Sequence, residues 1–309
     1  MKTGGLEDHI IGLIETREND KSGSSIRSTR AALEQCELEN PMAKKKSRRL
    51  PPAVAPKPRS HSWYGWVPDL PDQRDRIYQA PQRMVAALPR AVDLRGGCPG
   101  VYDQGELGSC TANAIAGALE FDQIKQRMTD VFVPSRLFIY YNERVIENTV
   151  DEDAGAMIRD GIKSVSKQGA PHEKIWPYVV AKFRTKPTPA AYKDAAKHRA
   201  LLYQRVTQTL QQLKGCLAAG YPIVFGFSVY ESFESDAVAK SGKVPMPSSK
   251  EKQLGGHAVL AVGYDDKLKR FIVRNSWGPT WGLTGYFTMP YDYLVDANLA
   301  DDFWTIKQV

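Results

Sequence analysis

Cysteine is scarce in this sequence, with four residues among 309, at positions 36, 98, 110 and 216. No two of them form a Cys-x-x-Cys pair. This spacing excludes a disulfide-dense secreted scaffold and gives no sign of a zinc or dithiol redox site. Long apolar runs are also missing, because no stretch approaches the roughly 18 residues that a membrane-spanning helix requires. We therefore expect no membrane span, no metal and no cofactor.

The first residues do not read as a secretory signal. Met1 to Asp20 has no continuous apolar core, and its apolar residues fall at the spacing of an amphipathic helix beside acidic residues. The sequence therefore favours a protein that is cytoplasmic or exported by a route other than the Sec pathway.

The chain is basic but carries no nucleic-acid motif. Its formal net charge is +7 and its pI is near 9.1, and the densest basic run is residues 44–49. Such a run can be a nuclear signal or a nucleic-acid patch, yet it stands alone in a polar segment, which favours a solvated linker. We expect no nucleic-acid partner.

Composition divides the chain into three parts. Residues 1–59 are polar, charged and finally rich in proline, which predicts a disordered or loosely attached tail. Residues 60–87 regain aromatic side chains, among them Trp63, Tyr64 and Trp66, and this favours a propeptide-like segment that packs on the body. Residues 88–309 are expected to form the folded domain, since 42% hydrophobic residues overall can build a substantial core.

The folded part changes character along its length. Residues 110–127, 134–146, 155–167 and 190–219 show helical patterning, whereas 222–227, 257–264, 271–274 and 285–289 are β-branched or aromatic runs bounded by glycine, aspartate or proline. This order predicts an α+β fold with two lobes and a cleft between them.

The most informative motif is the run from Gln104 to Cys110, in which a turn of small residues leads into a helix that begins with a cysteine. The partial positive charge at a helix N-terminus favours a thiolate, which is the nucleophilic form of cysteine. A buried cysteine that begins a helix is more often simple core packing, so the assignment depends on finding a base.

His257 and Asn275 complete a reactive set. Among the five histidines, only His257 lies at the end of an apolar strand beside glycines, which would let a substrate backbone approach closely. Asn275 ends the next strand and precedes Trp277. An asparagine there can orient an imidazole by a hydrogen bond that an indole shields from water.

Together these three blocks resemble the papain-like cysteine peptidases of family C1. The resemblance covers about residue 88 to the C-terminus and rests on Gln-Gly…Gly-Ser-Cys at 104–110, His-Ala-Val…Val-Gly-Tyr at 257–264 and Asn-Ser-Trp-Gly…Trp-Gly at 275–282. Cys110 and His257 lie 147 residues apart, within the roughly 130–150 of that family. The resemblance implies a helical left lobe, an antiparallel β-barrel-like right lobe and an active-site cleft between them.

The resemblance also implies roles. Cys110 would attack the peptide carbonyl, His257 would act as its acid and base, Asn275 would orient His257, and Gln104 would complete the oxyanion hole. The residues expected to bind the substrate peptide are Gly155, Ala156, Gly256 and Trp277. The family is made with N-terminal extensions that cover the cleft, so synthesis as a zymogen inhibited by its own N-terminal segment is implied.

The sequence departs from the family signature C-G-[SA]-C-[WY] at two positions, where Leu107 replaces the first cysteine and Thr111 the aromatic residue. The disulfide at the first position is therefore impossible, and the pattern is closer to bacterial members. Cys98 and Cys216 could form a replacement bridge, although two free thiols are favoured. Two alternatives to a peptidase stay open, a non-catalytic peptide-binding homologue and a thiol acyltransferase.

Overall fold

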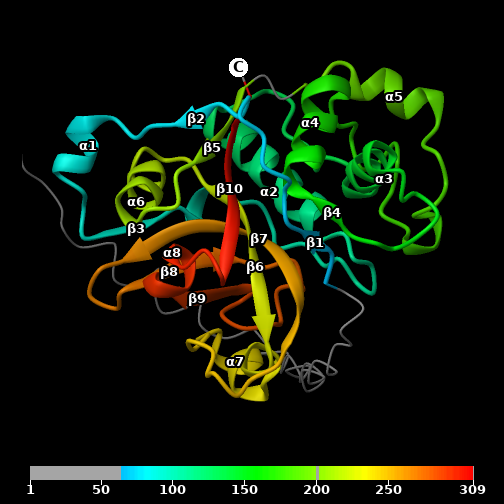
Figure 1. The fold of residues 1–309 in the computed structure, drawn as a ribbon. Helices are drawn as coiled ribbons and strands as arrows, with labels where there is room; N and C mark the ends of the chain where they lie inside the picture. Colours follow the sequence, from blue (N-terminus) through cyan, green and yellow to red (C-terminus); the bar gives the residue numbers. More distant parts are fainter. Residues whose placement is uncertain (1–63, 200–201, 309) are drawn as a thin grey trace, which may run out of the picture. The chain divides into compact units, whose positions relative to one another are not determined.

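A computed structural model describes residues 64–199 and 202–308. The predicted tail at 1–59 lies outside these residues, as does the start of the segment predicted at 60–87. The described chain has two regions: a helical lobe, formed by α2 to α5, and a sheet lobe, formed by β5 to β10 with shorter helices on it (Figure 1).

The helices are α1 (Gln82–Ala86), α2 (Cys110–Lys125), α3 (Arg136–Glu147), α4 (Ile158–Gln168), α5 (Pro189–Ala195), α6 (Leu210–Ala218), α7 (Asp236–Ser241) and α8 (Tyr291–Val295). The strands are β1 (Trp66–Val67), β2 (Ile77–Tyr78), β3 (Ala91–Asp93), β4 (Ala156–Met157), β5 (Leu202–Val206), β6 (Ile223–Tyr230), β7 (Gln253–Asp265), β8 (Arg270–Arg274), β9 (Tyr286–Pro290) and β10 (Ala300–Lys307).

The helix boundaries follow local chemistry. The Ser135 side chain accepts a hydrogen bond from the Phe138 N–H and so caps the start of α3. Helix α4 stops at Gly169, whose φ of 81° is accessible to glycine at little cost. These helices were predicted within a few residues. The helical prediction for 190–219 was wrong in its middle, because β5 forms there between α5 and α6.

The main sheet has the strand order β2-β5-β10-β6-β7-β8-β9, and β3 pairs separately with β7. Its pairs are antiparallel except β2 with β5. Strand β2 comes from the segment before residue 88, and its Tyr78 is buried. Residues 77–78 thus form a strand of the sheet, although they precede the predicted start of the body.

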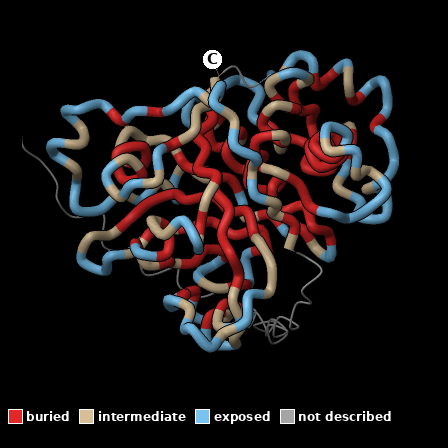
Figure 2. The backbone as a smooth tube through the Cα atoms, in the orientation of Figure 1, coloured by how far each residue is buried: buried red, intermediate tan, exposed pale blue. Residues whose placement is uncertain are grey.

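Buried residues run through the strands of the sheet and the helices packed on it (Figure 2), and their side chains form two cores on opposite faces of the sheet. Side chains alternate between the faces along a strand, so Val224 and Leu260 pack against the helical lobe while Phe225 and Val259 pack in the second core. In the first core α2 lies against α3, α4 and the strands β6, β7 and β10. The mixed α+β class predicted from the sequence is confirmed.

Candidate active site

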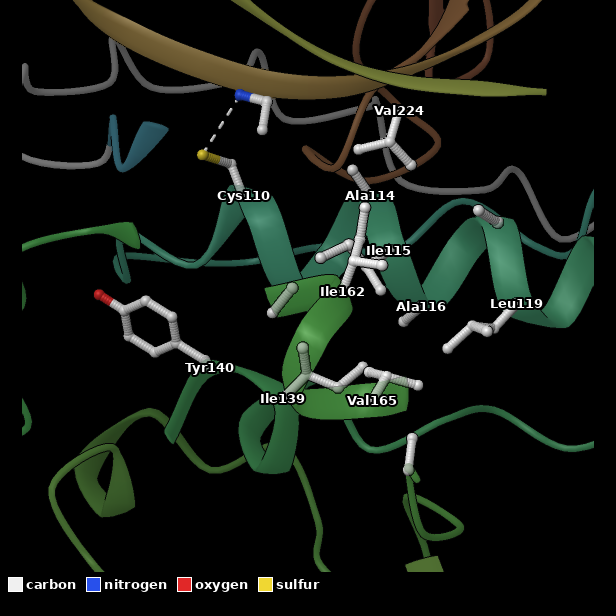
Figure 3. Close-up of a cluster of buried hydrophobic side chains, with 14 of the residues drawn as sticks. Cys110, Ala114, Ile115, Ala116, Leu119, Ile139, Tyr140, Ile162, Val165 and Val224 are labelled. Carbon is white, nitrogen blue, oxygen red and sulfur yellow. Dashed lines mark hydrogen bonds between the residues drawn. The ribbon is translucent and has the colours of Figure 1, made fainter. Parts of the chain in front are cut away.

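Cys110 is the first residue of α2 and is fully buried. Its Sγ atom points toward the sheet and accepts a hydrogen bond from the Ala258 N–H at 3.3 Å (Figure 3). The loop before α2 is held by two neighbours. The Asp153 carboxylate accepts from the Gly108 N–H at 3.0 and 3.1 Å, and the Tyr178 hydroxyl donates to the Gln104 carbonyl at 2.8 Å. These contacts hold the loop at Gln104 and at Gly108, and so fix the start of α2.

His257 lies beside Ala258 on β7, so the strand brings it to the same point as the cysteine. Its Nε2 is 2.9 Å from Asn275 Oδ1, and that oxygen also accepts from the Ser276 N–H at 2.9 Å. Because an amide oxygen only accepts hydrogen bonds, Nε2 carries the proton. The Trp277 ring stacks on the imidazole with 5.0 Å between centroids and 29° between planes. Asn275 and Trp277 thus fix the ring.

Gln104 lies at the same place and is fully buried. Its Nε2 donates to the Leu107 carbonyl at 2.9 Å, and its Oε1 accepts from the Ser276 hydroxyl at 2.6 Å. Its backbone N–H donates to the Ser276 carbonyl at 2.8 Å. Ser276 therefore connects Gln104 to Asn275. Sequence reasoning missed its role, although it stands inside the Asn-Ser-Trp motif.

The position expected for the cleft holds residues of the chain itself, Tyr64 to Val67. Strand β1 runs parallel to β4, with Trp66 opposite Ala156 and Val67 opposite Met157. The Gly65 carbonyl accepts from the Ala156 N–H at 2.7 Å, and the Gly65 N–H is close enough to the Cys110 sulfur to lower the pKa of the thiol. The backbone of this segment therefore passes directly over the thiol.

Glycines make this close passage feasible. A Cβ atom at Gly65 would be 1.7 Å from the Gly108 carbonyl oxygen, and one at Gly155 would be 2.2 Å from the Gly65 oxygen. Gly256 and Gly226 border the Trp66 indole, where a Cβ would lie 2.8 and 1.9 Å from ring carbons. No side chain fits between the segment and its groove at these points.

The Trp66 indole fills a slot whose polar end is Asp302. The indole Nε1–H donates to Asp302 Oδ2 at 3.0 Å, and that oxygen also accepts from the Asp69 N–H at 2.8 Å. Arg205 donates to the other oxygen of Asp302 at 2.9 Å. The Arg159 guanidinium holds Asp75 farther along the segment, at 2.5 Å. Neither the slot nor these charge pairs were predicted, since no local motif marks them.

The aromatic start of the segment covers the imidazole. The Tyr64 ring lies edge-on to His257 with 5.9 Å between centroids and 6.1 Å from Trp277, and its hydroxyl donates to Glu234. All the residues expected to bind substrate, Gly155, Ala156, Gly256 and Trp277, therefore lie around residues 64–66.

Burial dominates the electrostatics of the thiol. It raises the pKa of Cys110 to about 12, and hydrogen bonds from the backbone of Ala258 and Gly65 offset only part of this effect. Glu143, which accepts from the Thr111 hydroxyl at 2.7 Å, has a pKa well above its ordinary value for the same reason. In the covered form the cysteine is thus a neutral thiol, in contrast to the thiolate that the helix N-terminus alone predicts.

The other cysteines of the described chain, Cys98 and Cys216, are free, so the bridge between them considered from the sequence does not form. Cys98 is half-buried and directs its thiol to the Leu94 carbonyl at 3.5 Å, whereas Cys216 is buried in the second core. Within residues 64–199 and 202–308, no helix has the length and apolar character that a membrane span requires.

Comparison with known proteins gives concordant matches. The family described as "Papain family cysteine protease" matches residues 88–303. An "Uncharacterized peptidase C1-like protein L477" of Acanthamoeba polyphaga mimivirus is 45% identical over 270 residues, 80% of this chain and 87% of the viral one. The crystal structure of xylellain, a cysteine protease from Xylella fastidiosa, has 48% identity and a TM-score of 0.77, and covers 83% of this chain and 100% of that one.

More distant relatives agree. Cathepsin L of Sarcophaga peregrina is 26% identical over 215 residues, which are 65% of this chain and 59% of the cathepsin. Digestive procathepsin L 3 of Tenebrio molitor has a TM-score of 0.62 at 18% identity and covers 80% and 76% of the two chains, a likeness of fold alone. The family match spans well over half of the chain and coincides with the lobes that hold Cys110 and His257. The chain belongs to the papain family and is a cysteine peptidase.

Proposed function

We propose that Cys110 and His257 are the catalytic pair of this peptidase and that residues 64–67 hold it in a self-inhibited form. The observation that carries the proposal is the junction of α2 and β7, where Cys110 Sγ meets the Ala258 N–H at 3.3 Å and His257 is fixed by Asn275 at 2.9 Å. With Nε2 committed to Asn275, Nδ1 is the ring nitrogen that serves the sulfur.

The reaction follows from these positions. In the uncovered enzyme Cys110 transfers its proton to His257, and the thiolate attacks the carbonyl carbon of a peptide bond. The oxyanion accepts hydrogen bonds from the Cys110 N–H and the Gln104 amide, worth about 10²–10³ in rate per donor. His257 protonates the amine as the C–N bond breaks, and then removes a proton from the water that hydrolyses the thioester. Asn275 holds the His257 imidazole in the same orientation in both steps.

The covering segment is suited to inhibit and not to be cut. It presents the Gly65 N–H to the sulfur, while the Gly65 carbonyl is turned to the Ala156 N–H. The sulfur therefore faces a hydrogen-bond donor instead of an electrophilic carbonyl carbon. Burial also raises the pKa of the Cys110 thiol to about 12, which favours its protonated form. Both effects favour a zymogen in which the N-terminal part of the chain is the inhibitor.

The slot filled by Trp66 is proposed as a pocket for a substrate side chain. It is flat, since Gly226 and Gly256 border the indole, and it ends in an acceptor, Asp302. Arg205 is ion-paired with Asp302 at 2.9 Å and with Asp301 at 2.8 Å, so one oxygen of Asp302 is already engaged and the other is left to accept a hydrogen bond. A large aromatic side chain with a hydrogen-bond donor is its best occupant.

The test uses the full chain with a recognition sequence for a foreign protease inserted between Gln73 and Arg74, in an exposed turn. Cutting there leaves β2 in place, which a start at residue 88 would remove. Fluorogenic peptides that vary one residue at a time before the cleaved bond are assayed under reducing conditions, before and after the cut and removal of the released fragment. Cys110→Ala is the matched control.

We expect hydrolysis only after the cut, none in Cys110→Ala, and the highest kcat/KM for a peptide with tryptophan at the position that enters the slot. A cut form that neither hydrolyses peptides nor reacts with an epoxide thiol reagent at Cys110 would favour the peptide-binding alternative. Transfer of the acyl group to an added amine without hydrolysis, seen by mass spectrometry, would favour the acyltransferase.

A further inference from the structure

Three connections of the helical lobe meet at a group of side chains that the peptidase reaction does not use. Asp130 lies before α3, His172 follows α4, and His198 follows α5. One oxygen or ring nitrogen from each lies within 4.8 Å of the others. Two imidazoles and one carboxylate are ligands that zinc and similar divalent metal ions prefer.

His172 is oriented in the manner of a metal ligand. Its Nδ1 is 2.8 Å from Asp194 Oδ2, and the same oxygen accepts from the His172 backbone N–H at 3.1 Å. The Phe132 ring stacks on the imidazole with 4.0 Å between centroids. With Nδ1 fixed on a buried carboxylate, Nε2 points out of the lobe toward Asp130 Oδ2, at 3.1 Å. A carboxylate behind a histidine in this way sets the tautomer and raises the basicity of the exposed nitrogen.

His198 is positioned independently of His172. Its carbonyl accepts from the Ala170 N–H at 3.1 Å and its N–H donates to the Ala195 carbonyl at 2.9 Å, so its backbone is fixed on both sides. Its ring is edge-on to His172 with 5.1 Å between centroids and contacts Phe132 at 4.5 Å. The second imidazole therefore faces the same point as His172 Nε2 from another segment.

An ion pair explains only part of this arrangement. Pairing of the His172 ring with Asp130 and Asp194 accounts for the two contacts at 3.1 and 2.8 Å, but it gives no reason for a second imidazole at the same point. Tetrahedral zinc, with bonds of about 2.0–2.1 Å, separates its ligand atoms by roughly 3.3 Å. Asp130 already lies at 3.1 Å from His172 Nε2, so the remaining separations, all within 4.8 Å, need to shorten by at most about 1.5 Å. Asp130 is exposed.

We propose that Asp130, His172 Nε2 and His198 form a binding site for a zinc-type divalent ion, with water as the fourth ligand. The ion clips together the three connections before α3, after α4 and after α5. The ion stabilises the helical lobe and takes no part in the chemistry at Cys110.

The experiment is a calorimetric titration of Zn²⁺ into the full chain carrying Cys110→Ala, which removes the reactive thiol and any self-cleavage, and no histidine tag. We expect one ion per chain and a higher thermal midpoint with zinc. His198→Ala and Asp130→Asn, both at partly exposed positions that the fold can tolerate, are each expected to weaken binding at least tenfold. His61→Ala, a histidine outside the described residues, is the matched control and is expected to bind as before.

Two results overturn the proposal: no binding of zinc by the Cys110→Ala chain, or equal affinity in His198→Ala and its parent. Co²⁺ provides a second readout, because tetrahedral nitrogen and oxygen ligation gives visible absorption without the charge-transfer band of a thiolate. A thiolate band would assign the ion to Cys36, Cys98 or Cys216 instead. Asp194→Asn tests the orientation of His172, with an expected loss of about tenfold in affinity.

Discussion

Removal of the Trp66 side chain is the sharpest test of the self-inhibited form. The indole is partly buried in the slot beside Gly226 and gives one hydrogen bond to Asp302. Truncation of a fully buried tryptophan to alanine costs about 3–5 kcal/mol, and partial exposure reduces this to about 2–3 kcal/mol. If the whole loss acts on the equilibrium between the docked and the released segment, the docking constant falls by about 30- to 150-fold.

The assay is the rate at which iodoacetamide alkylates Cys110 in the intact chain, followed by mass spectrometry. The sulfur is fully buried while the segment is docked, so alkylation proceeds through the open form. The rate is therefore expected to rise by the same 30- to 150-fold in Trp66→Ala.

Leu70→Ala is the matched control, because it shortens an apolar side chain of the same segment that is 67% exposed. It is expected to change the rate less than about twofold, as surface substitutions alter stability by about 0.5 kcal/mol or less. Equal alkylation rates in Trp66→Ala and wild type would refute the reasoning, because the thiol would then be reached without release of this segment.

Three further outcomes are expected. Gly226→Ala places a methyl group 1.9 Å from the Trp66 indole, so alkylation should accelerate as in Trp66→Ala while the thermal midpoint stays within a few degrees; unchanged alkylation would contradict the packing. Burial and the nearby Asp302 raise the pKa of Asp69 from 3.8 to about 7 in the docked segment. Docking is therefore strongest below pH 4 and weakens as the pH rises to about 7. Asp69→Asn should abolish this dependence, so that its alkylation rate relative to that of the wild type changes with pH over this range. Gln104→Ala in the cut enzyme should lower kcat by about 10²–10³ with little change in KM, and a change in KM alone would assign the amide to substrate binding.

The sequence predicted the residues at the junction of α2 and β7 because each lies in a local motif. Cys110 begins a helix after a turn of small residues, and Asn275 ends a strand before Trp277, so neighbours in the sequence are enough to mark them. The slot could not be predicted from the sequence, because its residues are not neighbours in the chain. Trp66 and Asp302 are 236 residues apart, and only the pairing of β10 between β5 and β6 brings them together.

Strand β5 shows a second limit. Its sequence, Leu-Tyr-Gln-Arg-Val, contains polar residues that suit a helix surface as well as a strand. It becomes a strand because β10 and β2 pair with it on its two sides, and because Arg205 meets Asp301 and Asp302 there. Tertiary pairing therefore overrides local propensity at this point. The covering segment was predicted to pack on the body from its aromatic residues, but its parallel register with Ala156 required the structure.

In the proposed self-inhibited form, the residues of β1 remain tethered to the enzyme, because only nine residues separate Val67 from β2, which is itself part of the main sheet. A short tether of this kind keeps a ligand at an effective concentration on the order of millimolar. Even a segment of weak intrinsic affinity therefore returns to the cleft faster than a dilute substrate can enter it. Opening alone is a reversible fluctuation of the intact chain, whereas a cut in the turn at Gln73 and Arg74 converts the inhibitor into a separate molecule that dilution removes. In the proposed zymogen, activation would thus require the cleavage of one bond and no change of affinity.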